Sequence, residues 1–133
     1  MYIETLRTHS KIEMIDITGS IRQIVKKSGV KNGICLVYVP HTTAAVTINE
    51  NADSSVKRDI ISKLSQLIPE GDNYTHIEGN SDAHIKSSII GASVVIPIDS
   101  DNLVLGTWQG IFFCEFDGPR TRKFFVQIVD SQK

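Results

Sequence analysis

Several features that would assign a chain to a particular class are scarce or missing in this sequence. It has two cysteines, Cys35 and Cys114, far apart and each inside an apolar run, which we interpret as buried, reduced thiols of a cytoplasmic protein. Its net charge is −1 with no basic run, so nucleic acid is not an expected partner. No apolar run approaches membrane-spanning length, and the first residues do not resemble a signal peptide.

What is present is the composition of an ordinary globular domain. Hydrophobic residues make up 41% of the 133 residues and charged residues 22%. A chain of this length can bury a hydrophobic core without disulfides or structural metal ions. We therefore expect residues 1–133 to form one domain.

The spacing of apolar residues predicts a mixture of strands and helices. Strand patterns fall at 2–8, 11–17, 34–39, 44–48, 92–98, 103–105, 111–116 and 123–129. Helical spacing falls at 18–29, in the region after residue 53 up to 67, and at 81–90. The apolar run at 34–39 is typical of a strand buried on both faces near the middle of a sheet. We predict an α+β fold, with a mixed, mainly antiparallel sheet and two to three helices packed on it.

The stretch from residue 74 to 91 combines several kinds of polar side chain in one short segment. It holds His76 and His84, two of the four histidines, together with a carboxylate at Glu78. Imidazoles bind metals or move protons near neutral pH. The other polar residues that we assign to a pocket in this stretch are Asn80, Lys86, Ser87 and Ser88.

The second half of that stretch has the pattern of a short helix. Ser81 or Asp82 is the expected N-cap, and Ile85 and Ile89 are expected to form the buried apolar face. His84 then lies in the first turn, where free backbone N–H groups and the helix dipole favour an anion. The pattern predicts a polar pocket at the start of this helix.

A second polar stretch follows the apolar run at 34–39. His41, Thr42 and Thr43 stand at the exit of that strand, and Glu50 and Asp53 precede the longest predicted helix. Strand ends and helix starts are common positions for binding and catalytic groups. The alternative is structural, because Asp53 or Asn51 is also a favoured N-cap.

The segment Asp-Gly-Pro-Arg-Thr-Arg at 117–122 is a strong hairpin signal. Arg120 and Arg122, two residues apart, suit a phosphate clamp, although a solvated hairpin tip is the simpler interpretation. Trp108, between two glycines, predicts a bulge or a close backbone approach. Its side chain favours core packing, with pocket lining as the alternative.

Four blocks in this order resemble the YjbQ-like family: HTTAAVTINENAD, YTHIEGNSDAHIKSSIIGAS, LVLGTWQGI and DGPRTR. The resemblance implies a single-domain α+β fold and a compact homotrimer. It also implies a secondary thiamine-phosphate synthase activity, which joins hydroxymethylpyrimidine diphosphate to thiazole phosphate and releases pyrophosphate. A metal ion near His41, His76 and His84 is implied as well.

The expected site has three groups of residues. The predicted metal ligands are His41, His76 and His84, which suit zinc; magnesium arriving with the substrate diphosphate is the alternative. The predicted catalytic carboxylates are Glu50, Asp53 and Glu78. The predicted substrate-binding residues are Thr42, Thr43, Asn80, Lys86, Ser87, Ser88, Trp108, Gln109, Arg120 and Arg122.

The leading hypothesis is a small metal-dependent enzyme that acts on a phosphorylated small molecule, with thiamine-phosphate synthesis as its implied activity. A non-catalytic protein that binds a metal or a phosphorylated metabolite is the first alternative. A metal-assisted hydrolase is the second, because a metal lowers the pKa of bound water. A third reading makes the histidine stretch a trimer contact. Whether the site lies within one chain or between subunits is open.

Overall fold

Eight strands and three helices follow one another in the computed structural model, which describes residues 1–131. The strands are β1 (Tyr2–Arg7), β2 (Glu13–Asp16), β3 (Gly33–Tyr38), β4 (Ala44–Glu50), β5 (Ser93–Asp99), β6 (Asn102–Leu103), β7 (Gln109–Glu115) and β8 (Thr121–Asp130). The helices are α1 (Thr18–Ser28), α2 (Ser54–Leu67) and α3 (Ser81–Ile90). The predicted α+β class is confirmed.

The strands form two antiparallel sheets. The larger has the order β1-β8-β3-β5-β6, and the smaller has the order β2-β7-β4. β3 lies between β8 and β5, with Cys35 opposite Ile128 on one side and Ile96 on the other. The central position predicted for this strand is therefore confirmed. Chain order does not reveal that β7 and β8, consecutive in sequence, belong to different sheets.

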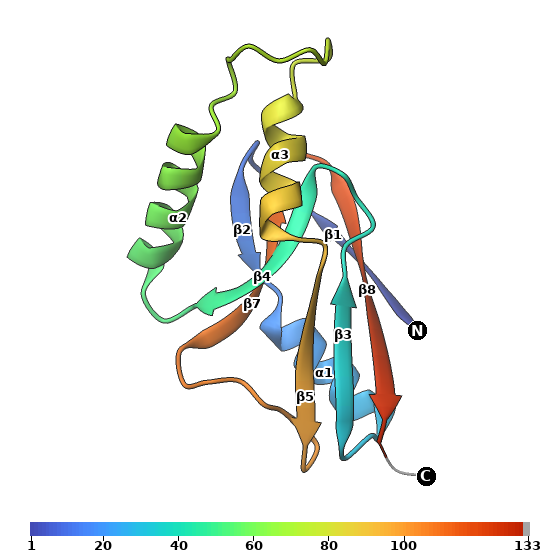
Figure 1. Ribbon diagram of the computed structural model, residues 1–133. Helices are drawn as coiled ribbons and strands as arrows, with labels where there is room; N and C mark the ends of the chain where they lie inside the picture. Colours follow the sequence, from blue (N-terminus) through green and yellow to red (C-terminus); the bar gives the residue numbers. More distant parts are fainter. Residues whose placement is uncertain (132–133) are drawn as a thin grey trace.

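The main core lies on the inner face of the five-stranded sheet. α1 packs there, behind the sheet in Figure 1, and contributes fully buried Ile21. Val37 and Val126 face it from β3 and β8, and Phe113 closes the core from the smaller sheet. Large apolar side chains that are fully buried in this way each stabilise the fold by about 1.5–3 kcal/mol.

A second, smaller core lies between the three-stranded sheet and the other two helices. Ala83 of α3 and Phe112 of β7 are buried in it, and Ile60 and Leu64 of α2 pack against it. A loop of residues 68–80 joins α2 to α3 at the top of Figure 1. The two helices therefore hold this loop above the end of the smaller sheet.

Helix α3 exposes the face that its sequence pattern predicts to be buried. Ile85 and Ile89 are 38% and 61% exposed, so that prediction is wrong. The buried face instead carries Asp82 and Lys86, which form an ion pair at 2.8 Å inside the protein. The N-cap is Asn80, not Ser81 or Asp82. Pairing within one helix turn neutralises both charges and allows the lysine stem to pack in the interior.

The outer face of the five-stranded sheet is apolar and uncovered in the single chain. Ile34 and Tyr38 of β3 are 46% and 44% exposed, so the prediction that this strand is buried on both faces is wrong. Val95 on β5 and Val129 on β8 are also exposed on this face, next to β3 in the registers of the sheet. We call this surface the outer sheet face.

Both cysteines are buried and free, as predicted. Burial raises the pKa of Cys35 to about 11 and that of Cys114 to about 12. Among residues 1–131, no helix is long and apolar enough to cross a membrane. Location in the cytoplasm stays a prediction.

We expect neither thiol to react in the native protein, because the thiolate is the nucleophile and burial suppresses it. The measurement is absorbance after addition of Ellman's reagent at pH 8, with and without urea. Two thiols should react in urea and almost none in buffer over the same time. Rapid, complete reaction in buffer would show that one of these strands opens readily.

Candidate functional site

A polar hollow of about 630 Å³ lies beneath the loop of residues 68–80, and we call it the main hollow. The start of α3 and the turn between β7 and β8 form its other walls. Its lining is almost entirely polar and consists of Lys11, Thr42, Thr43, Glu70, His76, Glu78, Gly79, Asn80, His84, Asp117 and Arg120. Segments far apart in the sequence meet here.

Two histidines face each other at the edge of this hollow. The rings of His76 and His84 are 5.5 Å apart between centroids, in an edge-to-face arrangement. Glu78 lies 3.9 Å from Nε2 of His76, and its side chain is largely exposed. His84 is held by the first turn of α3, whereas His76 is carried by the loop. The two imidazoles are therefore close enough to act on one bound molecule.

The cations of the main hollow already have carboxylate partners. Lys11 pairs with Glu70 at 2.6 Å and Arg120 with Asp117 at 3.1 Å. Burial acts to lower the pKa of Lys11, but the hydrogen bond to Glu70 and nearby carboxylates raise it. Asn80 adds a hydrogen bond from Nδ2 to Asp117 at 3.0 Å. The lining is consequently of mixed charge and is organised before any ligand arrives.

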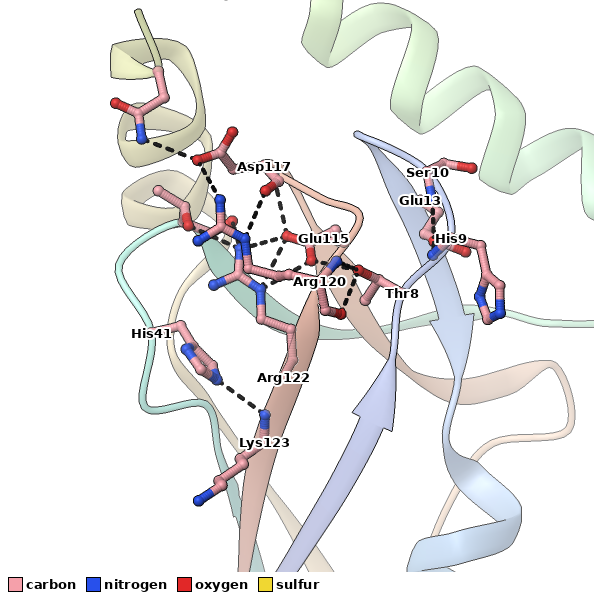
Figure 2. Close-up of polar contacts among 12 residues, drawn as sticks. Thr8, His9, Ser10, Glu13, His41, Glu115, Asp117, Arg120, Arg122 and Lys123 are labelled. Atoms are coloured by element: carbon pink, nitrogen blue, oxygen red, sulfur yellow. Dashed lines mark hydrogen bonds and ion pairs between the residues drawn. The ribbon is translucent and has the colours of Figure 1, made fainter. Parts of the chain in front are cut away.

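A buried ion pair connects the two sheets below the hollow, and Figure 2 shows it. Arg122 donates from Nε to Glu115 Oε1 at 2.9 Å, and from Nη2 to Thr43 Oγ1 at 2.8 Å. Thr8 donates to the same carboxylate at 2.8 Å. Glu115 and Arg122 are 0% and 3% exposed. Burial acts to raise the pKa of Glu115, but hydrogen bonds from Arg122, Asp117 and Thr8 outweigh it and lower that pKa.

The turn between β7 and β8 closes tightly over this pair. A Cβ atom on Gly118 would lie 2.4 Å from the carbonyl oxygen of Ser10 and 2.8 Å from Cγ of Glu115. Only glycine fits so close to the backbone and to a buried side chain. The glycine of the DGPRTR segment is therefore required by packing, and the following bond to Pro119 is cis.

His41 lies apart from the other two histidines in its hydrogen bonding. Its Nε2 accepts a hydrogen bond from the backbone N–H of Lys123 at 3.0 Å. The lone pair that would bind a metal at Nε2 is thus already used, and the ring proton is on Nδ1. Burial, and then the charges of Arg122 and Arg120, lower the pKa of His41.

The predicted three-histidine metal site is wrong. Within residues 1–131, no three or more histidine, cysteine, aspartate or glutamate side chains are arranged to hold a metal ion. His76 and His84 form a pair, and His41 is committed to Lys123. The prediction missed this because a backbone donor eighty-two residues away cannot be read from local sequence. Whether the protein needs a divalent metal ion, zinc or magnesium, stays an untested prediction.

Four of the predicted site residues lie near the C-terminal end of β4, whereas the main hollow lies near its start: Glu50, Asp53, Trp108 and Gln109. Glu50 ends that strand, about 20 Å from its start at roughly 3.3 Å per residue. Asp53 is the N-cap of α2 and accepts hydrogen bonds from Ser55, as the structural alternative predicted. Trp108 is 62% exposed, so core packing is excluded, and Gln109 accepts from Gly106 N at 2.8 Å. These residues do not join the histidines within one chain.

The remaining predicted residues surround the hollow in different ways. Thr42, Thr43 and Asn80 line it, whereas Lys86 is buried beneath it with Asp82. Ser87 and Ser88 line an adjoining hollow of about 480 Å³, together with other residues that include His41 and His84. Both hollows are therefore bounded by His84 and Thr42.

Sequence reasoning missed several residues of the site. Lys11, Glu70 and Asp117 line the main hollow, and Glu115 anchors it from below. Asp117 belongs to the same DGPRTR turn as Arg120, but turn formation accounts for it almost completely at the level of sequence. Lys11 and Glu70 belong to no motif, and only the tertiary structure brings them together.

The fold and the site define a class: a one-domain α+β protein with two antiparallel sheets and a polar surface hollow that holds paired histidines. The family model described as UPF0047 protein YjbQ-like matches residues 3–131. The chain belongs to this family.

Relatives match the chain along nearly its whole length. A UPF0047 protein of Methanocaldococcus jannaschii is 59% identical over 96% of this chain and 92% of its own. The UPF0047 protein YugU of Bacillus subtilis is 46% identical over 93% of this chain and 95% of its own. The crystal structure of an uncharacterised YjbQ/UPF0047 protein from Clostridium acetobutylicum, 50% identical, matches with a TM-score of 0.96 over 97% and 100% of the two chains.

The prediction of thiamine-phosphate synthase activity is corrected by these comparisons. The relatives carry only the UPF0047 description, and a solved relative from Sulfolobus solfataricus, with a TM-score of 0.93 and 39% identity over 98% and 97% of the chains, is described as a protein of unknown function. The predicted metal-dependent mechanism is also wrong, since the described residues do not bring its metal ligands together. This activity was predicted from the family resemblance alone, and no residue pattern in the chain requires it.

We expect Arg122→Met to destabilise the protein by roughly 3–5 kcal/mol, because it leaves the Glu115 carboxylate buried without its partner. The measurement is the free energy of unfolding in urea. Arg7→Met is the matched control, an exposed arginine on β1 whose loss should cost less than about 0.5 kcal/mol. Adding Glu115→Leu to Arg122→Met should recover part of the loss. Equal stability of the two single variants would contradict a structural role for the buried pair.

Proposed function

We propose that the chain binds a small polar molecule in the main hollow and that His76 and His84 exchange a proton with it. The observation that carries this proposal is the meeting of the two imidazoles, 5.5 Å apart, at the edge of a polar hollow. Histidine is the side chain best suited to give and take a proton near neutral pH.

The charges of the lining favour a ligand with both hydrogen-bond donors and acceptors. Lys11 and Arg120 are each paired with a carboxylate, so the hollow is not simply cationic. A volume of about 630 Å³ falls in the range of small-molecule sites, which is about 300–1,000 Å³. Asn80 supports the same view, because its Oδ1 is buried with no hydrogen-bond partner among the described residues.

The two histidines also differ in how firmly they are held, so they can play different roles towards a bound molecule. His84 is part of α3, and the carbonyl of its own residue accepts from Ser88 at 2.9 Å. His76 is on the loop, whose position is supported by Tyr74 donating to the carbonyl of Pro69 at 2.5 Å. Its neighbour Ile77 is 96% exposed. A rigid and a loop-borne imidazole can together contact a molecule that enters from the solvent.

The test is a screen of small polar metabolites by ligand-observed NMR, followed by proton NMR of each binder over time for chemical change. We expect His76→Gln and His84→Gln to weaken binding several-fold and to abolish any turnover. His9→Gln is the matched control, since His9 is an exposed histidine outside the lining. If all three variants bind and react alike, the histidine pair has no such role.

We also propose that the chain forms the predicted homotrimer through its outer sheet face. Support comes from the exposed apolar side chains there, including Ile34, Tyr38, Val95 and Val129. Interfaces are depleted of charge at their centre and enriched in aromatic residues, and large uncovered apolar patches are rare on monomers. Ile85 and Ile89 of α3 add further exposed apolar surface.

Light scattering after gel filtration should give three times the chain mass of 14.7 kDa. Val95→Lys should lower that mass, because it places a charge in the middle of the outer sheet face. Leu67→Lys is the control, an exposed apolar residue at the end of α2, outside that face. A monomeric wild-type protein at micromolar concentration would reject the trimer.

A further inference from the structure

Another hollow, which we call the second hollow, adjoins the main one and is distinct from the hollow lined by Ser87 and Ser88. It has a volume of about 540 Å³ and is lined by Tyr38, Pro40, His41, Thr42, Thr43, Arg120 and Arg122. It shares Thr42, Thr43 and Arg120 with the main hollow. Unlike the main hollow, its lining includes no carboxylate. The two hollows therefore differ in chemistry while meeting at three residues.

Two arginines line this second hollow, and the carboxylates paired with them lie outside its lining. Arg120 is half exposed, and it uses Nε and Nη2 for the carbonyl and carboxylate oxygens of Asp117. Its Nη1 has no hydrogen-bond partner within residues 1–131 and is free to donate. Arg122 is held by Glu115 and Thr43 and contributes its charge from below. Figure 2 shows both guanidinium groups between Asp117 and His41.

His41 is fixed as a neutral donor at the same hollow. Because Nε2 accepts from the N–H of Lys123, the ring proton lies on Nδ1, where the ring can only donate. Burial first, and then the charge of Arg122, lowers the pKa of His41, which favours the neutral ring. A neutral imidazole donor beside two guanidinium groups is suited to an anion, and its Nε2 lone pair is not free for a metal ion.

The hydroxyl-bearing residues complete the set. Thr42 is exposed at the rim, and Thr43 is buried with its Oγ1 accepting from Arg122. Both belong to the segment that leads from His41 into β4. Oxoanions are typically bound by arginine together with neutral N–H and O–H donors, which match their several acceptor oxygens.

We infer that this second hollow is an oxoanion subsite, in which a phosphate or carboxylate group is bound by Arg120, His41 and Thr42. The inference rests on the proposed function in one respect: the anion belongs to the molecule whose remaining part occupies the main hollow. The shared residues Thr42, Thr43 and Arg120 place the two parts of such a ligand next to each other. Arg122 has a supporting role, because its guanidinium is committed to the buried pair.

The test uses inorganic phosphate as the probe and the full chain, with backbone amide NMR shifts and calorimetry as the readouts. Phosphate should shift the amide signals of residues 41–43 and of Lys123, whose N–H contacts the His41 ring. Arg120→Met should weaken phosphate binding at least about tenfold, which equals about 1.4 kcal/mol. Arg7→Met is the control, since it removes the same charge from an exposed arginine outside the hollow.

His41→Gln separates the role of this histidine from that of the backbone. A glutamine oxygen can still accept from Lys123, so the loop is expected to keep its position while the Nδ1 donor is lost. Phosphate binding should fall several-fold in this variant. Acetate is the second probe: preference for phosphate assigns a phosphoryl group to the subsite, and preference for acetate assigns a carboxylate.

The subsite is rejected if phosphate leaves the amides of 41–43 unshifted, or if Arg120→Met and Arg7→Met bind it equally. These failures differ from a failure of the proposed function. His76→Gln and His84→Gln should leave phosphate binding in the second hollow unchanged, because neither residue lines it. If a metabolite binds more weakly to the His76 and His84 variants but phosphate does not bind at all, the proposed function of the main hollow stands. Only the oxoanion subsite is then rejected.

Discussion

The buried pair of Glu115 and Arg122 is the interaction on which the site depends. Glu115 ends β7 in the smaller sheet, and Arg122 lies near the start of β8 in the larger sheet. Their contact, with Thr8 and Thr43 bonded to the same groups, connects three chain segments at one point. Burying two charges is costly, and it is tolerated only where each is paired and hydrogen-bonded, as here. The strand ends that meet at this pair carry His41, Thr42, Asp117 and Arg120 on their loops.

That arrangement separates residues with similar chemistry into different tasks. Arg122 is engaged in the buried ion pair with Glu115. Arg120, two residues earlier, is half exposed and still has N–H groups free to donate. His41 is held as a neutral donor by a backbone N–H, whereas His76 and His84 face each other at the edge of the main hollow. Residue type alone predicts the same role for all three histidines. Hydrogen-bond partners, which depend on the folded chain, distinguish them.

Helix α3 shows the same dependence on tertiary context. Its pattern, with Ile85 and Ile89 four residues apart, predicts an apolar inner face. The helix instead buries Asp82 and Lys86, whose mutual neutralisation makes burial tolerable, and presents its isoleucines to solvent. This orientation also turns His84 towards the loop of residues 68–80 and into the main hollow. The apolar pattern of the helix fails to predict its buried face because the pattern carries no information about the elements that pack against the helix.

The sequence by itself determined the α+β class, the order of strands and helices and the buried thiols, and it limited the N-cap of α2 to Asn51 or Asp53, because these follow from periodicity, composition and local hydrogen bonds. It also located the polar stretches that carry the histidines. Only the tertiary structure decided that β7 and β8 enter different sheets, that Lys11 and Glu70 join the main hollow, and that Glu50 and Trp108 lie far from it. It also decided that His41 is bonded to Lys123. The physical reason is that these contacts join residues distant in sequence, and a local pattern carries no information about such partners.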